Sequence, residues 1–257
     1  MKKIISALSA AMVLAASVST TAFAACEEYD FNGDGVTNSM DMSVYRKYLM
    51  TDGGTKEYEG SNDSGASSGY SKNFDEYFKN IELTDDAIAK IAALGDSLDY
   101  NDLINKFFEE GFYVTDVNKD GKFDINDPQL ILQYFADIST GRVSLTDEQI
   151  AFIVENCNYS GEHQVDSLDA SILVSRLRTV LRTSYKIGDT NLDGAVDAID
   201  ASNVLTLYAK SQTGGLDSDQ PDEYTYVRML GDMNDDGKAD ALDASLILSS
   251  YASAQTK

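Results

Sequence analysis

The chain has 257 residues, and its 43 Asp and Glu residues outnumber its 20 Lys and Arg residues, giving a formal net charge of −23. This acidity argues against nucleic acids and anionic membrane surfaces as partners, because both carry negative charge themselves. After the first 25 residues, no segment is apolar enough to cross a bilayer, which takes roughly 20 apolar residues.

Residues 1–25 have the pattern of a secretory signal peptide. Two lysines precede an apolar stretch over residues 4–18, and Ala22-Phe23-Ala24 fits a cleavage site. We therefore expect cleavage near residue 24 or 25 and export to a secreted, extracellular location, where calcium is plentiful. Cys26 follows directly, so lipidation at Cys26 and association with the cell surface form an alternative.

Four twelve-residue segments then share one acidic pattern. Each reads Asp-x-Asn-x-Asp-Gly and has another Asp six residues after the Gly; the starts are Asp30, Asp116, Asp189 and Asp232, which define loops 1 to 4. Calcium is a hard cation that takes six to eight oxygen ligands, and such loops supply them from positions 1, 3, 5, 7, 9 and 12. We expect about four Ca²⁺ sites. The alternative is a set of surface turns rich in Asp, Asn and Gly.

The expected ligands occupy the same positions in every loop, with the position-7 residue contributing its backbone carbonyl. They are Asp30, Asn32, Asp34, Val36, Asn38 and Asp41 in loop 1; Asp116, Asn118, Asp120, Lys122, Asp124 and Asp127 in loop 2; Asp189, Asn191, Asp193, Ala195, Asp197 and Asp200 in loop 3; and Asp232, Asn234, Asp236, Lys238, Asp240 and Asp243 in loop 4. Without metal these carboxylates repel one another, so metal binding and folding should be coupled.

Two other segments keep only part of the pattern. In the degenerate loop, Asn158–Asp169, His163 replaces the Gly at position 6, which leaves calcium binding there open. Its remaining oxygen side chains are Ser160, Glu162 and Asp166. We interpret His163 as an exposed loop residue, because no Cys or second His accompanies it with zinc spacing. The segment that ends at Asp99 has Ile88 at position 1, and we expect no metal there.

Helices are predicted after each loop, because apolar residues recur four and eight positions past the final Asp. These pairs are Tyr45 and Leu49, Ile131 and Phe135, Val204 and Tyr208, and Ile247 and Tyr251. Additional helices should start within 83–89 and 145–151, where a Thr offers capping chemistry, and near Pro221. Tyr45, Tyr48, Tyr134, Tyr208 and Tyr251 have core spacing, whereas Tyr58, Tyr70, Tyr77, Tyr224 and Tyr226 fall outside it and are candidates to face a ligand.

The spacing of the units alternates between long and short steps. This predicts an all-α fold of tandem small modules, each a pair of EF-hand-like loop–helix units, over residues 26–110, 111–184 and 185–257. Residues 52–73 form an insertion rich in Gly and Ser within the first module. Cys26 and Cys157 allow one disulfide in an exported protein, but both being free is equally compatible with the sequence.

The paired loops, each followed by a short apolar helix, resemble type I dockerin repeats, and residues 185–257 resemble them most. Ile199-Asp200-Ala201-Ser202 nearly repeats as Leu242-Asp243-Ala244-Ser245. The resemblance implies a C-terminal dockerin that binds a cohesin domain of a scaffold protein in a cellulosome-type complex. It implies partner-binding residues at Ala198, Ile199, Ala201, Ser202, Ala241, Leu242, Ala244 and Ser245. Many dockerins have Ser or Thr where Ile199 and Leu242 stand, and the alternative is that these two side chains fill the core.

No catalytic pattern stands out. The chain lacks a recognisable catalytic triad or a phosphate-binding motif, and the repeats occupy nearly all of the mature sequence. We therefore expect a non-catalytic assembly protein. Two other hypotheses are a calcium-dependent polysaccharide-binding protein, although the chain has no Trp, and a calcium-dependent surface protein without a cohesin partner.

Overall fold

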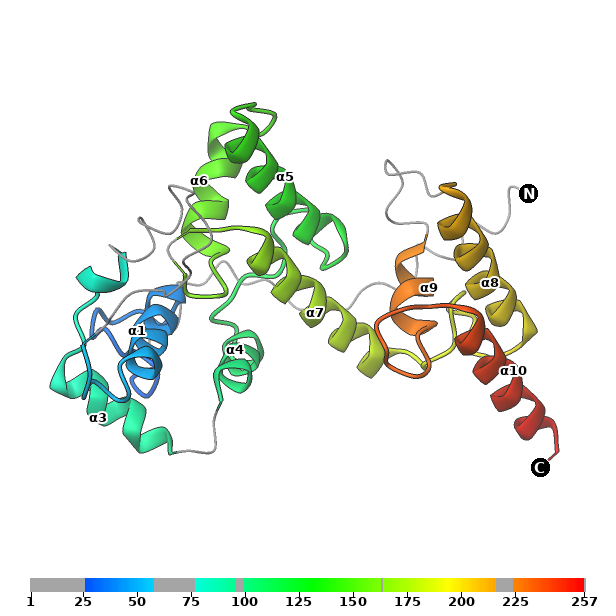
Figure 1. The fold of residues 1–257 in the computed structure, drawn as a ribbon, viewed down its shortest axis with the longest axis horizontal. Coiled ribbons are helices and arrows are strands. Elements are labelled where there is room, and N and C mark those ends of the chain that lie inside the picture. Colours follow the sequence, from blue (N-terminus) through cyan, green and yellow to red (C-terminus); the bar gives the residue numbers. More distant parts are fainter. Residues whose placement is uncertain (1–25, 58–76, 96–98, 163, 216–223, 257) are drawn as a thin grey trace. The chain divides into compact units, whose positions relative to one another are not determined.

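The computed structural model of the chain describes residues 26–57, 77–95, 99–162, 164–215 and 224–256 (Figure 1). Within these ranges the chain forms α-helices joined by loops and has no strand, which confirms the all-α class. The helices are α1 (Ser39–Met50), α3 (Asp85–Leu94), α4 (Tyr100–Glu109), α5 (Asn126–Thr140), α6 (Asp147–Asn156), α7 (Ser167–Ser184), α8 (Ala198–Thr213), α9 (Thr225–Leu230) and α10 (Ala241–Gln255). Of the helices in these ranges, none combines the length and the apolarity that crossing a membrane requires.

Three predicted features lie wholly or mostly outside the described residues. They are the signal peptide at 1–25, the insertion at 52–73 and the helix start near Pro221. The other two predicted helix starts are confirmed. Thr84 caps α3, where its side chain accepts a hydrogen bond from a backbone N–H, and Thr146 forms a reciprocal capping box at the start of α6.

The chain divides into two compact units, Met1–Leu173 and Val174–Lys257, which we call the N-terminal and C-terminal units. The division falls inside α7 and not at the expected boundaries after residues 110 and 184. A helix that links two units in this way leaves no loop whose composition marks the boundary. No change in composition therefore predicts a unit boundary at residue 173.

The core of the N-terminal unit continues across the expected boundary at residue 110. Phe108 packs against both Tyr113 and Tyr159, with ring centroids 5.0 and 5.2 Å apart. The Tyr113 hydroxyl donates to the Tyr159 carbonyl at 2.9 Å, and the Tyr159 hydroxyl donates to the Val114 carbonyl at 2.7 Å. Buried phenols need such partners. The segments 26–110 and 111–173 thus share one aromatic core and are not separate modules.

Helix α1 pairs with the degenerate loop, which lies more than a hundred residues away in the sequence. The Ser43 hydroxyl donates to the Gly161 carbonyl at 2.5 Å across 118 residues. Gly161 has a φ of +62°, and a Cβ there would lie 2.8 Å from the Met42 backbone. Only glycine permits this close approach. Asp99, which the sequence analysis aligned with the closing Asp of the loops, is instead the exposed N-cap of α4.

In the C-terminal unit, α8 and α10 pack against each other and α9 contacts α8 (Figure 1). The core is small. Its central cluster consists of Ala201, Val204, Leu207, Val227, Ala244 and Ile247, and Leu177, Leu181, Met229 and Leu230 of the same unit are buried as well. The residues four positions past the closing Asp are fully buried, as predicted, but Tyr208 and Tyr251, eight positions past it, are each 37% exposed. A side chain eight positions further along a helix points about 80° away around the helix axis, and this places it beyond the narrow core.

Candidate metal centres

The Asp at position 12 closes every intact loop in the same way. One of its carboxylate oxygens accepts from the backbone N–H of position 2 at 2.7–2.8 Å and from that of position 3 at 3.2–3.3 Å. The other oxygen accepts from the N–H of position 9 at 2.8–2.9 Å. All four of these residues have 0% exposure: Asp41, Asp127, Asp200 and Asp243. The closing Asp therefore ties both ends of its loop to the start of the following helix.

The Asp at position 1 organises the turn at the other end of the loop. Its carboxylate accepts from the N–H of the Gly at position 6, at 2.9–3.0 Å in every intact loop. The φ of this Gly lies between +84° and +88°, a conformation that side chains disfavour. Position 4 also has positive φ, as in Lys119, Leu192 and Asp235. Loops 1 to 4 thus share one backbone conformation, with a sharp turn at each position-6 Gly.

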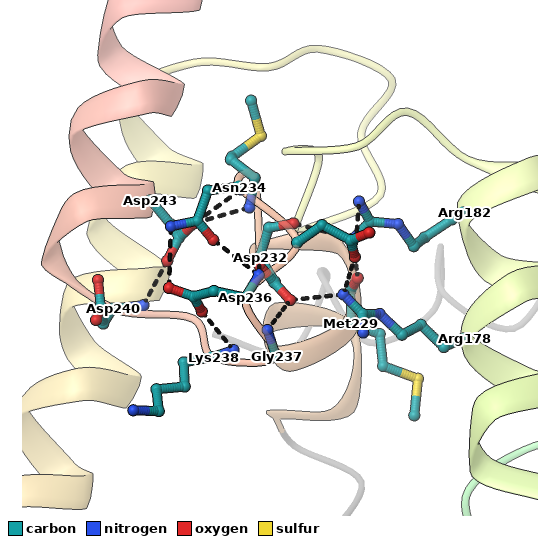
Figure 2. Close-up of polar contacts among 12 residues, drawn as sticks. Arg178, Arg182, Met229, Asp232, Asn234, Asp236, Gly237, Lys238, Asp240 and Asp243 are labelled. Carbon is teal, nitrogen blue, oxygen red and sulfur yellow. Dashed lines mark hydrogen bonds and ion pairs between the residues drawn. The ribbon is translucent and has the colours of Figure 1, made fainter. Parts of the chain in front are cut away.

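Positions 3, 5 and 9 direct further oxygens along the loop. The Asn at position 3 accepts from the N–H of position 5 at 2.9–3.0 Å, and the Asp at position 5 accepts from that of position 7 at 2.8–3.0 Å. Position 9 is the N-cap of the helix in loops 1, 3 and 4, where it forms a capping box with position 12. Figure 2 shows this network in loop 4 around Asp232, Asn234, Asp236 and Asp243.

The carbonyls at position 7 are the remaining expected ligands. They belong to Val36, Lys122, Ala195 and Lys238. In the part of the chain that the structure describes, none of these carbonyls accepts a hydrogen bond from a backbone or side-chain donor. They are therefore acceptors that a cation can use without displacing a protein donor.

The buried carboxylates carry an electrostatic cost. Burial raises the pKa of Asp41 to about 7, with the charge of Asp30 adding to the shift, and burial raises the pKa of Asp127 to about 6. In loop 3, burial and the neighbouring charges of Asp200 and Asp193 raise the pKa of Asp189. Positions 1, 5 and 12 are thus close enough to repel one another.

The donor set fits calcium, because every expected ligand is a hard oxygen and each carboxylate has lone pairs beyond those that accept N–H groups. Within the described ranges, however, the structure gathers no group of three or more Asp, Glu, His or Cys side chains that are positioned to hold a metal. The loop carboxylates are directed mainly at backbone N–H groups. Metal coordination would therefore require these carboxylates to reorient toward the ion.

The degenerate loop closes like the others but contains a cation from the protein itself. Asp169 is fully buried and accepts from the backbone N–H groups of Ser160 and Asp166 at 2.8 Å each, and burial raises its pKa to about 7. Glu162, at position 5, forms an ion pair with Arg46 of α1 at 2.5 Å. His163 lies outside the described residues.

Arg46 is held in this position by several contacts. Its guanidinium donates to the Ser160 carbonyl at 3.3 Å and lies 5.9 Å from the ring centroid of Phe78 and 5.7 Å from that of Tyr100. Cation–π contacts of this kind stabilise a partly buried charge. The sequence analysis missed Arg46, because nothing in the spacing linked residue 46 to a loop that begins at residue 158.

The expected partner-binding residues divide into two groups. Ile199 is 57% exposed and Leu242 is 56% exposed, which excludes the alternative that they fill the core. Ala201 and Ala244 are 2% and 1% exposed, so their assignment to a partner-binding surface is wrong: they pack between α8 and α10. The remaining expected residues are exposed: Ala198, Ser202, Ala241 and Ser245.

The two cysteines are free, with Cys157 buried and Cys26 half-buried. Tyr45 and Tyr134 are buried as expected and Tyr48 packs on the core. Of the tyrosines outside the core spacing, Tyr77 donates to the Ser43 hydroxyl at 3.1 Å. Two others in that group are partly buried, Tyr224 and Tyr226, and two lie outside the described residues, Tyr58 and Tyr70.

Comparison of the chain with protein-family models, with curated proteins and with solved structures finds no match.

Proposed function

We propose that this chain is an exported, non-catalytic protein that binds one Ca²⁺ in each of its four intact loops. We further propose that it docks through α8 and α10 onto a cohesin domain of an extracellular polysaccharide-degrading complex. The partner class comes from the resemblance of residues 185–257 to type I dockerins. The geometry of the loops and helices supports the calcium sites and the docking surface.

The calcium proposal is supported by the common conformation of loops 1 to 4. Loop 1 presents side-chain oxygens from three carboxylates and two Asn residues, and loops 2 to 4 each present them from four carboxylates and one Asn. In each loop the position-7 carbonyl accepts no hydrogen bond among the described residues. Burying this much negative charge is costly unless a cation compensates it. In the degenerate loop Arg46 supplies positive charge at position 5, and we therefore propose four Ca²⁺ ions per chain and not five.

The docking proposal depends on a surface that occurs twice, which we call the docking face. It consists of exposed residues at matching positions of two helices: Ala198, Ile199, Ser202, Leu205, Thr206 and Ala209 on α8, and Ala241, Leu242, Ser245, Leu248, Ser249 and Ala252 on α10. The sequence analysis missed the outer half of this face, because it followed only the residues next to the loops. Leu205 and Leu248 are each 43% exposed.

The lack of charge on this face is the observation that carries the docking proposal. A quarter of the whole chain is charged, yet residues 198–209 and 241–252 contain one charged residue each, and both are the buried closing Asp. Exposed apolar surface without charge is typical of protein–protein interfaces. The matched copies also explain how two opposite docking orientations would use equivalent contacts.

The experiment is a binding assay of the full chain against a panel of cohesin domains, with and without chelator. We expect calcium-dependent binding. Because the face is duplicated, Ile199→Asp alone or Leu242→Asp alone should retain binding through the other copy. The double variant should weaken binding roughly 30-fold or more, since a buried charge at an interface anchor is strongly unfavourable.

The matched control is the double variant Leu132→Asp and Val143→Asp. These side chains are also apolar and exposed, at 44% and 75%, but lie in the N-terminal unit. The control should bind like the unmodified chain. Binding that survives chelation, or no binding to any cohesin, would contradict the proposal. Retardation in polysaccharide gels without cohesin binding would favour the carbohydrate-binding alternative.

A further inference from the structure

Loop 4 differs from the other intact loops in having arginines at its position-1 carboxylate. In Figure 2, Arg178 and Arg182 reach the loop from α7, on the side away from α10. The Arg178 guanidinium lies 2.6 Å from Asp232 Oδ2 and 2.5 Å from Asp235 Oδ1. The Asp232 side chain is only 1% exposed and that of Arg178 is 30% exposed, so this ion pair is partly shielded from water.

Arg182 strengthens the same contact one helical turn further along α7. Its guanidinium donates to the carbonyls of Asp232 and Met229 at 2.9 and 3.2 Å, and it lies 3.8 Å from Asp235 Oδ1. The two arginines are four residues apart and therefore share a helix face. Together they fix the end of α7 to the first turn of loop 4.

Loop 3 provides an internal comparison within the same unit. Asp189 and Asp232 each accept from the N–H of position 5 at 3.1 Å and from that of the Gly at position 6 at 2.9 Å. Among the residues that the structure describes, no Lys or Arg forms an ion pair with Asp189, nor with the position-1 Asp of loops 1 and 2. The backbone is the same in loops 3 and 4. In loop 3 the Lys186 ammonium donates to the Gly194 carbonyl, whereas in loop 4 a guanidinium contacts the position-1 carboxylate itself.

We propose that Arg178 lowers the calcium affinity of loop 4, so that loop 3 fills first and loop 4 fills at higher calcium. This inference rests on the proposed calcium sites. The guanidinium occupies Asp232 Oδ2 and neutralises part of the charge that attracts a cation, and it repels a divalent ion in the loop. By thermodynamic reciprocity, calcium in loop 4 must weaken the contact between Arg178 and the loop to the same extent. Loop 4 would then act as a calcium-dependent release for the end of α7.

The test is a calcium titration of the isotopically labelled full chain, followed by NMR. The amides of Gly194 and Gly237 donate to the position-1 carboxylates and so report on loops 3 and 4 separately. In the unmodified chain, Gly194 should reach its midpoint at lower calcium than Gly237. In Arg178→Met the Gly237 midpoint should fall about tenfold, as expected for loss of a nearby unit charge, while the Gly194 midpoint stays within about twofold.

Two further variants separate charge from other effects. Arg178→Lys keeps the charge and should leave Gly237 near its original midpoint. Arg142→Met removes one positive charge from an exposed position in the N-terminal unit and should change neither midpoint. If Arg178→Met does not fold, the order in which loops 3 and 4 bind calcium in the unmodified chain still tests the proposal.

The outcomes distinguish this inference from the proposed function. Simultaneous filling of loops 3 and 4, earlier filling of loop 4, or an unchanged or higher Gly237 midpoint in Arg178→Met would overturn the role of Arg178 alone. No calcium response from any loop would overturn the calcium sites, and this inference with them.

Discussion

The two units of the chain differ in the interactions that stabilise them. The N-terminal unit has an extended core in which Phe107, Phe108 and Tyr159 pack with other rings, and a guanidinium stands inside its degenerate loop. Among the described residues, the C-terminal unit has ten buried apolar residues, six of which form its central cluster, and two of these six are Ala. Buried apolar area is the main source of folding free energy. If the loops bind calcium as proposed, the stability of the C-terminal unit should therefore depend more strongly on that calcium.

Chelation should give the largest effect that this comparison predicts. A site that is saturated at a thousand times its Kd contributes about 4 kcal/mol, so two sites supply about 8 kcal/mol, which is comparable to the whole stability of a small domain. Removing calcium from the full chain should strongly destabilise the C-terminal unit, without fully unfolding it, and should affect the core of the N-terminal unit far less.

Hydrogen–deuterium exchange measures this difference directly. Peptides from α8 and α10 should lose protection by orders of magnitude in chelator, whereas peptides from α4 should change far less. Magnesium at the same ionic strength controls for screening. Equal loss of protection in both units, or no loss in either, would show that the size of the core does not decide the dependence on metal.

A substitution of the closing Asp should have the next largest effect, and it separates the two functions of that residue. Asp200→Asn in loop 3 removes hydrogen-bond acceptors and a proposed metal ligand. In the presence of calcium it should lower the free energy of unfolding by about 4 kcal/mol. The same change at Asp169 of the degenerate loop removes acceptors only, and should cost about 2 kcal/mol.

Denaturant unfolding with and without chelator measures how much unfolding free energy each substitution removes. The cost of Asp169→Asn should be the same in both conditions, because we propose that Arg46, and not calcium, compensates the charge in that loop. The cost of Asp200→Asn should shrink when chelator is present. A cost at Asp169 that depends on calcium would mean that the degenerate loop binds the metal after all.

The smallest predicted difference concerns two glycines with positive φ. Gly161→Ala should cost about 2 kcal/mol or more, because its Cβ would meet the Met42 backbone at 2.8 Å in addition to the strained φ. Gly237→Ala in loop 4 has open space around the Cβ and should cost about 1 kcal/mol from φ alone. Thermal unfolding of both variants in saturating calcium compares them, and a larger cost at Gly237 would contradict the close pairing of α1 with the degenerate loop.

Local patterns in the sequence were sufficient to predict the all-α class and the starts of helices such as α3 and α6. Asp at positions 1 and 12, with Gly at position 6, specifies hydrogen bonds within twelve residues, and the Thr84 and Thr146 caps are equally local. The exposure of Ile199 and Leu242 needed the structure, because an apolar residue at the start of a short helix fits either a core or an interface.

Long-range pairing was the part that the sequence did not predict. The contact between Ser43 and Gly161, and the ion pairs of Arg46 and Arg178 with loop carboxylates, join residues that are separated by 54 positions or more. Neither hydrophobic periodicity nor loop spacing contains that information. The expected boundary at residue 110 was wrong for the same reason, because it assumed that neighbouring units in the sequence pair with each other, as α8 and α10 of the C-terminal unit do.

The number of calcium ions bound per folded chain tests the central claim most directly. Native mass spectrometry of the mature chain in calcium should find four ions that chelator removes. A chain with none, at calcium concentrations typical of the extracellular medium, would contradict the claim that the intact loops are metal sites and that the C-terminal unit is stabilised by them.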